Sequence, residues 1–301
     1  MLLMSWKKQE QLAQDLAKMT KKRSQWRDVI QRFFRNKLAV VGFIIVVMLV
    51  FSAIFANLIT KYDYSEQIPP DKFIFPNSQH IMGTDNLGRD IFSRMLYGGR
   101  ISLLVAIIAV IMSGTLGIFL GAIAGFFGGK LDLLITRFLD IMMSIPSLLL
   151  ATAISMALGR GPFNTALAIA VTGTPSTMRI MRSTTLSIKS NEFVEAAKAT
   201  GSKQMRTLFR HILPNAVAPL IVNLTLHIGG NIMAVSGLSF IGLGVQPPTP
   251  EWGSILATGR PYIRDFWPLI VFPAVFIVLT VFGFNLVGDG LRDSLDPRLR
   301  D

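Results

Sequence analysis

Cysteine is absent from this sequence of 301 residues, and charged residues are scarce. Without a thiol the chain can form neither a disulfide nor a thiolate metal site. Asp, Glu, Lys and Arg together make up 16% of the residues, whereas a soluble domain carries about 25%. Hydrophobic residues make up 51%, and the mean hydropathy is +0.49. The composition therefore excludes an ordinary soluble domain and favours a membrane protein.

Long uncharged runs divide the chain into candidate membrane-spanning segments. Crossing the hydrocarbon core takes roughly 20 apolar residues, and a helix satisfies its own backbone hydrogen bonds there. Strand-like alternation is absent, so the runs predict helices. The run from 212 to 250 is too long for one span, and we divide it at Gly237 into a helix near 214–236 and an external loop. The runs are 38–60, 101–129, 141–159, 161–178, 212–250 and 266–288.

These runs predict an all-α, polytopic membrane protein with about six transmembrane helices and both termini in the cytoplasm. In this topology 22 of the 30 Lys and Arg residues lie in cytoplasmic segments, which is the positive-inside bias. Topology and lipid headgroups thus account for the net charge of +12, and we expect no nucleic-acid partner.

The predicted units in chain order are a basic cytoplasmic segment at 1–37, the first span at 38–60, an external segment at 61–100, the second span at 101–127, a core with spans three to six at 128–290, and a cytoplasmic tail at 291–301. The core includes paired cytoplasmic helices at 191–211 and an external loop at 237–265.

Motifs that bind nucleotides or metals are missing as well. No G-x-x-x-x-G-K-[ST] occurs, so the chain lacks that type of loop for a nucleotide phosphate. H-E-x-x-H and G-x-S-x-G are absent, and His80 and His211 fall near opposite membrane faces, away from His227. We therefore expect no metal, no cofactor and no catalytic residue. Asp140 and Asp289 lie only at the ends of predicted spans, whereas a proton-coupled carrier typically buries an acidic or His relay. The energy source is therefore expected to act from outside the chain.

The most informative segment is 192–214, where two short amphipathic helix patterns are separated by a glycine. Each pattern is predicted to place small or apolar side chains on one face and charged side chains on the other. The first combines Phe193, Ala196, Ala197 and Thr200 with Glu192, Glu195 and Lys198. The second combines Met205, Leu208, Phe209 and Ile212 with Lys203, Arg206 and Arg210. A small-residue face flanked by charge in the cytoplasm predicts a docking surface for another protein.

Span two contains a series of small residues at i+4 spacing. Gly117, Gly121 and Gly125 form its centre, within a series that runs from Ser113 to Gly129. Small residues at this spacing let another helix approach closely. The seam therefore serves either packing inside the bundle or contact with a second membrane subunit.

Polar residues and helix breakers mark the later spans. Asn223, His227 and Asn231 share one helical face of span five. Polar groups at this depth usually face a bundle interior or a water-filled cavity, so they either line a pathway or form hydrogen bonds between helices. Pro146 is expected to break span three, and the segment 173–175 (Gly-Thr-Pro) to interrupt span four.

The segment from Glu195-Ala196-Ala197 through Gly201 to Leu213-Pro214 resembles the EAA loop of ABC importer permeases. Three further segments are similar to the second permease of dipeptide, oligopeptide, glutathione and nickel importers. They are GTDNLGRDIFSRMLYGGRISL at 83–103, LSFIGLGVQPPTPEWG at 238–253 and NLVGDGLRDSLDPR at 285–298. Two positions differ from the family pattern: His211 stands where an isoleucine is usual, and Thr174 where a tryptophan is frequent. The resemblance covers nearly the whole chain from residue 27 onward.

This resemblance implies a type I ABC importer fold and a permease subunit that is not itself an enzyme. Its implied partners are a homologous permease in a heterodimer, two ATP-binding subunits, an extracytoplasmic binding protein and the inner or plasma membrane of a prokaryote. The residues implied to couple to the ATPase are Glu192, Glu195, Ala196, Ala197, Gly201, Leu213 and Pro214. The external segments 83–100 and 246–265 either receive the binding protein or cap the bundle. Short peptides are the expected substrate, with glutathione or nickel chelates as alternatives and a secondary carrier without an ATPase as the competing class.

Overall fold

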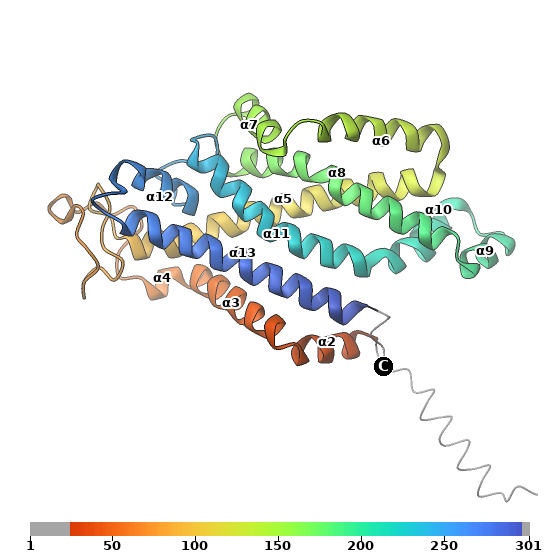
Figure 1. Cartoon of the computed structure of the whole chain (residues 1–301), viewed down its shortest axis with the longest axis horizontal. Helices are drawn as coiled ribbons and strands as arrows, with labels where there is room; N and C mark the ends of the chain where they lie inside the picture. The colour runs from red at the N-terminus through yellow and green to blue at the C-terminus, as the bar shows by residue number, and fades with distance from the viewer. Residues whose placement is uncertain (1–24, 297–301) are drawn as a thin grey trace, which may run out of the picture.

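The computed structural model describes residues 25–296, and these fold into helices joined by loops. Within this range the one extended pairing is an isolated bridge between Thr84 and Asp90. Long helices run side by side along the length of the molecule (Figure 1). They are α3 (Lys37–Ile54), α5 (Ile91–Phe127), α8 (Pro162–Lys189), α11 (Val217–Phe240) and α13 (Pro268–Leu295).

Shorter helices cover the ends and one side of this bundle. α2 (Gln25–Arg35) packs near the last turns of α13, while α4 (Ala56–Ile59) extends α3 at the other end. α12 (Trp252–Gly259) lies at the same end as α4 (Figure 1). α6 (Gly129–Met143) and α7 (Ser147–Leu158) run along the outside and meet at an angle of 91°.

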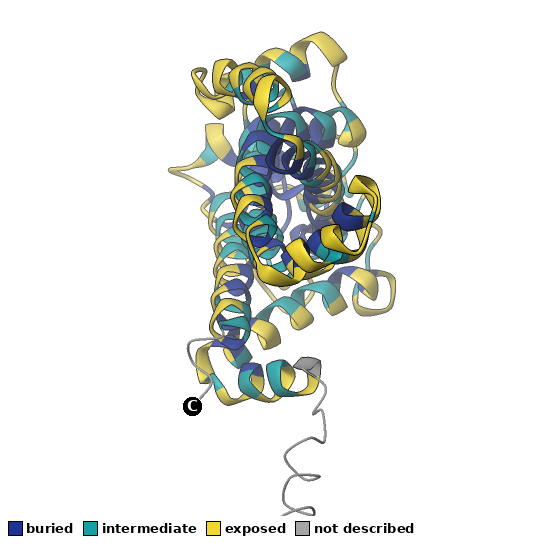
Figure 2. Ribbon diagram, turned by 90° about the vertical axis from the view of Figure 1, so that its right-hand side faces the viewer, coloured by how far each residue is buried: buried dark blue, intermediate teal, exposed yellow. Residues whose placement is uncertain are grey.

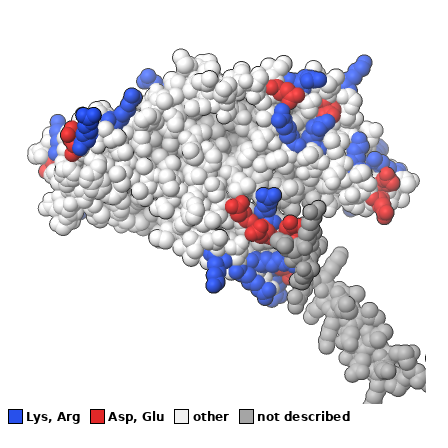
Figure 3. Space-filling view, viewed as in Figure 1, with Lys and Arg blue, Asp and Glu red and all other residues white. Residues whose placement is uncertain are grey.

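Four helical segments of the described chain are long and apolar enough to cross a membrane, and the α6–α7 pair adds a fifth. The six predicted spans each have a helix here, but α8 falls short of that standard, because its sequence combines Asn, Ser, Thr and Pro residues with the basic Arg179, Arg182 and Lys189. On the face shown in Figure 3, charged side chains gather at the two ends and leave an uncharged band between them. The all-α membrane fold is therefore confirmed.

Three predicted boundaries were wrong. Span three was predicted to begin at residue 141, but the chain is already helical from Gly129, where α6 begins. The break predicted at Pro146 corresponds to the bend between α6 and α7. α8 continues through the predicted interruption at 173–175, where its buried Thr174 and Pro175 keep the helix packed in the bundle. α11 continues past Gly237 to Phe240 and ends where Gly242 adopts a φ of +86°.

The predicted glycine seam packs against α8 of the same chain. A Cβ built on Gly121 would lie 2.5 Å from the carbonyl oxygen of Met178, and one on Gly125 would lie 2.8 Å from that of Arg182. Gly117 is equally close to Thr177, at 2.7 Å. Of the two interpretations, packing inside the bundle is therefore the one that these glycines serve. Figure 2 shows the resulting buried centre surrounded by an exposed outer surface.

The termini of the described range fall on one side. α2 and the last turns of α13 lie at the end of the molecule that also carries α9 (Glu192–Ala199), opposite α4 and α12 (Figure 1). The side chains of Asn36 and Asp293 are joined by a hydrogen bond of 3.3 Å. Most of the predicted segment 1–37 and half of the tail 291–301 lie outside the described residues, and the rest of the tail is the end of α13, which extends to Leu295.

Candidate functional site

The predicted docking segment projects beyond the ends of the long helices (Figure 1). Its helix, α9, follows α8 after a short turn at Ser190 and Asn191. Glu192 and Glu195 lie in the first turn and Lys198 in the last. This order of charges is favourable to the helix dipole, so a helix of only eight residues is stabilised by its own sequence.

α9 is attached to the bundle through Val194, which the predicted pattern did not include. Val194 is fully buried in a cluster with Met181, Ile188 and Leu208, whereas Phe193 is 44% exposed. The predicted pattern followed the i, i+3, i+4 spacing from Phe193 and so marked a face that is largely free, whereas Val194, on another face, makes the contact with the bundle. The side chains left on the free surface are Glu192, Phe193, Glu195, Ala196, Lys198, Ala199 and Thr200, with Ala197 half-buried. Within the described chain, neither glutamate has an ion-pair partner.

Gly201 turns the chain away from α9. Its φ is +83°, a conformation that side chains other than glycine rarely adopt, and a Cβ placed there would meet no atom within 4 Å. The amide of Ser202 donates to the carbonyl of Ala197 at 3.0 Å and closes the helix. Substitutions at Gly201 would therefore strain the turn without causing a clash.

The second predicted amphipathic helix is the beginning of span five and not a separate element. It consists of α10 (Gln204–Thr207), a π-helical turn (Leu208–Ile212) and a 3-10 turn (Leu213–Ala216) that lead into α11. Pro214 has no amide hydrogen to donate to the preceding turn, which accounts for the change of helix type in front of it. Leu213 is half-buried and Pro214 is exposed.

The three polar residues of α11 reach three different surroundings. Each i+4 step along an α-helix rotates the side chain by about 40°, so the face turns gradually. Asn223 lines a cavity, and its Oδ1 is buried without a hydrogen-bond partner in the described structure. The Nε2 atom of His227 lies 3.5 Å from the hydroxyl of Ser176 on α8. Asn231 donates to the carbonyl of Ala106 on α5, also at 3.5 Å, and so connects two helices.

The cavity next to Asn223 lies among α8, α11 and the end of α13. Its volume is about 520 Å³, and its walls are mainly apolar. Its polar lining residues are Asn215 from the 3-10 turn before α11, Asn223 from α11, Arg292 from the last turn of α13 and Asp296 directly after it. Because Asn215 and Asp296 lie at the end of the bundle that carries α9, this cavity belongs to the cytoplasmic half.

Comparison with known proteins decides the family. Residues 117–301 match the model for the binding-protein-dependent transport system inner membrane component, and residues 24–78 match the N-terminal transmembrane domain of oligopeptide transport permease C. The chain belongs to this family of inner membrane permeases. It is therefore a transport subunit of a cell membrane.

Named relatives of this permease cover nearly its whole length. It is 45% identical to the dipeptide transport system permease DppC of Alkalihalophilus pseudofirmus, with 92% of this chain and 91% of the relative aligned. It is 42% identical to the oligopeptide permease OppC of Bacillus subtilis over 96% and 95% of the two chains. The glutathione permease GsiD of Escherichia coli is 41% identical, with 100% of each chain aligned.

A solved structure shows the same fold at lower sequence similarity. A chain from the inward-facing MetNI methionine ABC transporter superposes with a TM-score of 0.55 and 18% identity. The match covers 67% of the permease and 96% of the solved chain. This likeness confirms the fold of an ABC importer membrane subunit.

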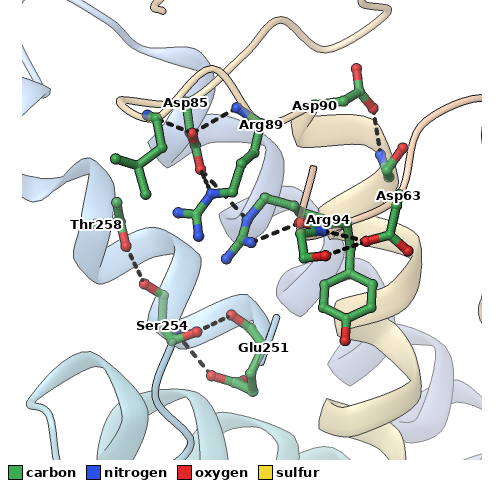
Figure 4. A network of polar contacts seen from close by, with 12 residues as sticks. Asp63, Asp85, Arg89, Asp90, Arg94, Glu251, Ser254 and Thr258 are labelled. Atoms are coloured by element: carbon green, nitrogen blue, oxygen red, sulfur yellow. Dashed lines mark hydrogen bonds and ion pairs between the residues drawn. The ribbon is translucent and has the colours of Figure 1, made fainter. Parts of the chain in front are cut away.

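The external end of the permease contains a network of buried polar side chains. Asp85 accepts a hydrogen bond from Nε of Arg89 at 2.6 Å, and Nε of Arg94 lies 3.7 Å from the same carboxylate (Figure 4). His80 contacts Asp90 at 2.9 Å. All these side chains are buried. The buried part of the motif at 83–100 therefore fixes the external loop against the start of α5.

Ion pairs connect the outer helix α6 of the permease to α8. Two ion pairs join α6 to α8: Asp132 with Arg182 at 2.5 Å and Asp140 with Arg179 at 2.6 Å. Asp140 was predicted to lie at the end of a span, because the uncharged run of span three begins only at residue 141, whereas α6 begins at Gly129. No sequence pattern singles out Ser176, which lies near His227 in space and about one helical turn before Arg179 in the sequence.

Proposed function

We propose that this chain and a homologous permease together form the translocation pathway of an ATP-driven importer for short peptides. An extracytoplasmic binding protein delivers the peptide, and two separate ATPase subunits drive the transport cycle through α9. The chain itself supplies no ATP-hydrolysing residues in this scheme. The observation that carries the proposal is the geometry of α9, a helix held by one buried valine with its other faces free.

The free surface of α9 fits a coupling contact. Ala196 and the half-buried Ala197 let a partner backbone approach closely, and Phe193 offers an apolar side chain for a pocket on the ATPase. Glu195 has no ion-pair partner within the described chain and is positioned to pair with a basic group of the partner. Val194 links this surface to Met181 and Ile188 of α8, so movement of α9 is transmitted into the bundle.

Peptides are the proposed cargo because the relatives at 42% to 45% identity are named for dipeptide, oligopeptide and di/tripeptide transport. Glutathione is the alternative that the E. coli relative at 41% favours. Both ligands contain amide groups and a carboxylate, so one pathway with neutral polar groups is compatible with either. Uptake of a labelled dipeptide in competition with glutathione separates the two.

Gly201→Arg tests the coupling proposal. The left-handed φ of Gly201 does not suit arginine, so the turn after α9 would shift and carry the docking surface with it. We expect peptide uptake by the reconstituted complex to fall at least tenfold while ATP hydrolysis is no longer stimulated by the loaded binding protein. Membrane insertion should be unchanged.

Gly159→Arg is the matched control. Gly159 has a φ of +84° and open space around it, as Gly201 has, but it lies between α7 and α8 at the opposite end of the bundle. We expect this variant to retain coupled uptake. Wild-type uptake in Gly201→Arg would rule out docking through α9, and equal losses in both variants would indicate general instability.

A further inference from the structure

A second cavity lies one helical turn away from the cavity next to Asn223. Its volume is about 350 Å³, and it is formed where α6 bends into α7 against α8. Pro146 lies at the bend, and Thr172 and Ser176 of α8 enter the cavity from the facing wall. The two cavities are referred to below as the bend cavity and the inner cavity.

α8 lines both cavities with one face. Thr172, Ser176 and Ile180 follow each other at i+4 spacing; the first two line the bend cavity and the third lines the inner cavity. Four residues of α-helix span about 6 Å, so Ser176 of the bend cavity and Ile180 of the inner cavity lie about one turn apart.

The contact between Ser176 and His227, whose neighbour Leu226 lines the inner cavity, is called the boundary below. Ser176 belongs to the wall of the bend cavity, while Asn223 and Leu226 on α11 belong to that of the inner cavity. The imidazole of His227 lies 3.5 Å from the Ser176 hydroxyl, at the outer limit for a hydrogen bond. Such a long contact is readily exchanged for a contact with another polar group.

The polar groups around this boundary are uncharged or able to act both as donor and as acceptor. A hydroxyl, a neutral imidazole and an amide can each do both. Oδ1 of Asn223 is a buried acceptor without a partner in the described structure, next to the inner cavity. Arg292 and Asp296 enter that cavity from the end of α13, farther toward the cytoplasm. The boundary therefore offers hydrogen bonds without preference for one sign of charge.

We propose that Ser176 and His227 form a polar constriction in the translocation pathway, which recognises the backbone amides of a passing peptide. The inference rests on the proposed peptide-import function. A peptide moving inward from the bend cavity exchanges its backbone hydrogen bonds with Ser176 and His227, and then donates to Asn223 in the inner cavity. Because only the backbone is recognised at this point, peptide side chains of different charge pass equally well.

Substitution of His227 tests the constriction in the complete, reconstituted transporter with saturating peptide-loaded binding protein. His227→Leu has a similar size but no hydrogen-bonding group, and we expect the maximum uptake rate to fall about fivefold, the effect of losing one hydrogen bond. His227→Gln keeps an amide and should retain more than half of the wild-type rate. Ser176→Ala should resemble the leucine variant, whereas Ser183→Ala, on the exposed face of α8, should be unaffected.

Peptides with acidic, neutral and basic side chains distinguish backbone recognition from recognition of side chains. At saturating binding protein we expect the wild type to carry all three at similar maximum rates, and His227→Leu to lower all three by the same factor. A loss confined to one charge class, equal losses in His227→Gln and His227→Leu, or wild-type uptake in His227→Leu would each overturn the constriction. If the wild-type complex carries no peptide at all, the proposed function fails first.

The absence of cysteine allows an independent measurement. Ser176→Cys introduces the one thiol of the chain at the constriction, and Ser183→Cys introduces one on the outer face of α8. We expect the loaded binding protein and ATP to change the rate at which a small, water-soluble thiol reagent modifies the variant at position 176 and not the one at position 183. Identical rates with and without substrate at position 176 would contradict the proposal.

Discussion

Glu251 shows how a single buried carboxyl can connect three helices of a membrane protein. It accepts hydrogen bonds from the hydroxyls of Ser102 on α5 and Ser236 on α11, at 3.0 and 3.4 Å, and from the amide of Ser254 on α12, at 2.9 Å. It caps α12 at the external end, outside the membrane-spanning helices (Figure 4). Burial raises the pKa of this carboxyl above its ordinary value of 4.5, and hydrogen bonds from Gly253, Ser254 and nearby serines oppose the rise in part.

The raised pKa of Glu251 predicts a pH-dependent stability. From pH 4.5 upward the unfolded chain loses its proton first, so the folded state binds more protons and stability falls as pH rises toward the folded-state pKa. Glu251→Gln keeps the shape and removes the titration, and we expect its melting temperature, followed by tryptophan emission in detergent, to depend less on pH. Glu66→Gln, at an exposed external position, is the control and should retain the wild-type profile. Equal pH dependence in wild type and Glu251→Gln would disprove the assignment.

At the scale of elements, the contact between α5 and α8 organises the bundle, and Gly121 lies at its closest point. Adding a single methyl group in Gly121→Ala would place it 2.5 Å from the carbonyl oxygen of Met178 and force the two helix backbones apart. Overpacking of this kind costs about 1–3 kcal/mol, and we expect a correspondingly lower melting temperature. Gly230→Ala on α11 adds the same methyl group in open space and should leave the melting temperature unchanged or raise it.

The same contact explains how far the elements could be predicted. Hydropathy located the helices because each span must be apolar, and the i+4 glycines predicted a close helix contact without naming its partner. The boundaries at Gly173 and Gly237 were misplaced because both glycines lie inside helices that their local propensity disfavours. The start of α6 was missed because its charged residues exclude it from the uncharged runs. For α9 the spacing predicted a helix, and its docking role stays a prediction; its rotation depends on the burial of Val194 against α8, which no local pattern contains. Ser176 could not be predicted, because its role comes from a neighbour 51 positions away.

At the scale of the whole molecule, whether α8 crosses the membrane determines on which side α9 lies. α8 is 28 residues long, yet it does not meet the hydropathy standard that α3, α5, α11 and α13 meet. Its basic residues are compensated: Asp132 pairs with Arg182 and Asp140 with Arg179, both from α6. Paired charge is less costly in a membrane than unpaired charge. We expect the partly buried Asp132–Arg182 pair and the exposed Asp140–Arg179 pair to help this rather polar helix to cross.

The crossing of α8 predicts from which side of the membrane three single-cysteine variants can be labelled. Each cysteine replaces an exposed residue of the cysteine-free chain. Gln79→Cys lies in the segment before α5, Arg160→Cys in the turn between α7 and α8, and Lys198→Cys on α9. If α8 crosses the membrane, a membrane-impermeant maleimide added to intact cells should label positions 79 and 160, and position 198 should be labelled only in inverted vesicles. If α8 does not cross, positions 160 and 198 share one side, and α9 could not meet an ATPase in the cytoplasm. Reversing one α6–α8 pair in an Asp132→Arg/Arg182→Asp variant should preserve this labelling, whereas Asp132→Ala alone, which leaves Arg182 without its partner, should lower the amount of protein inserted.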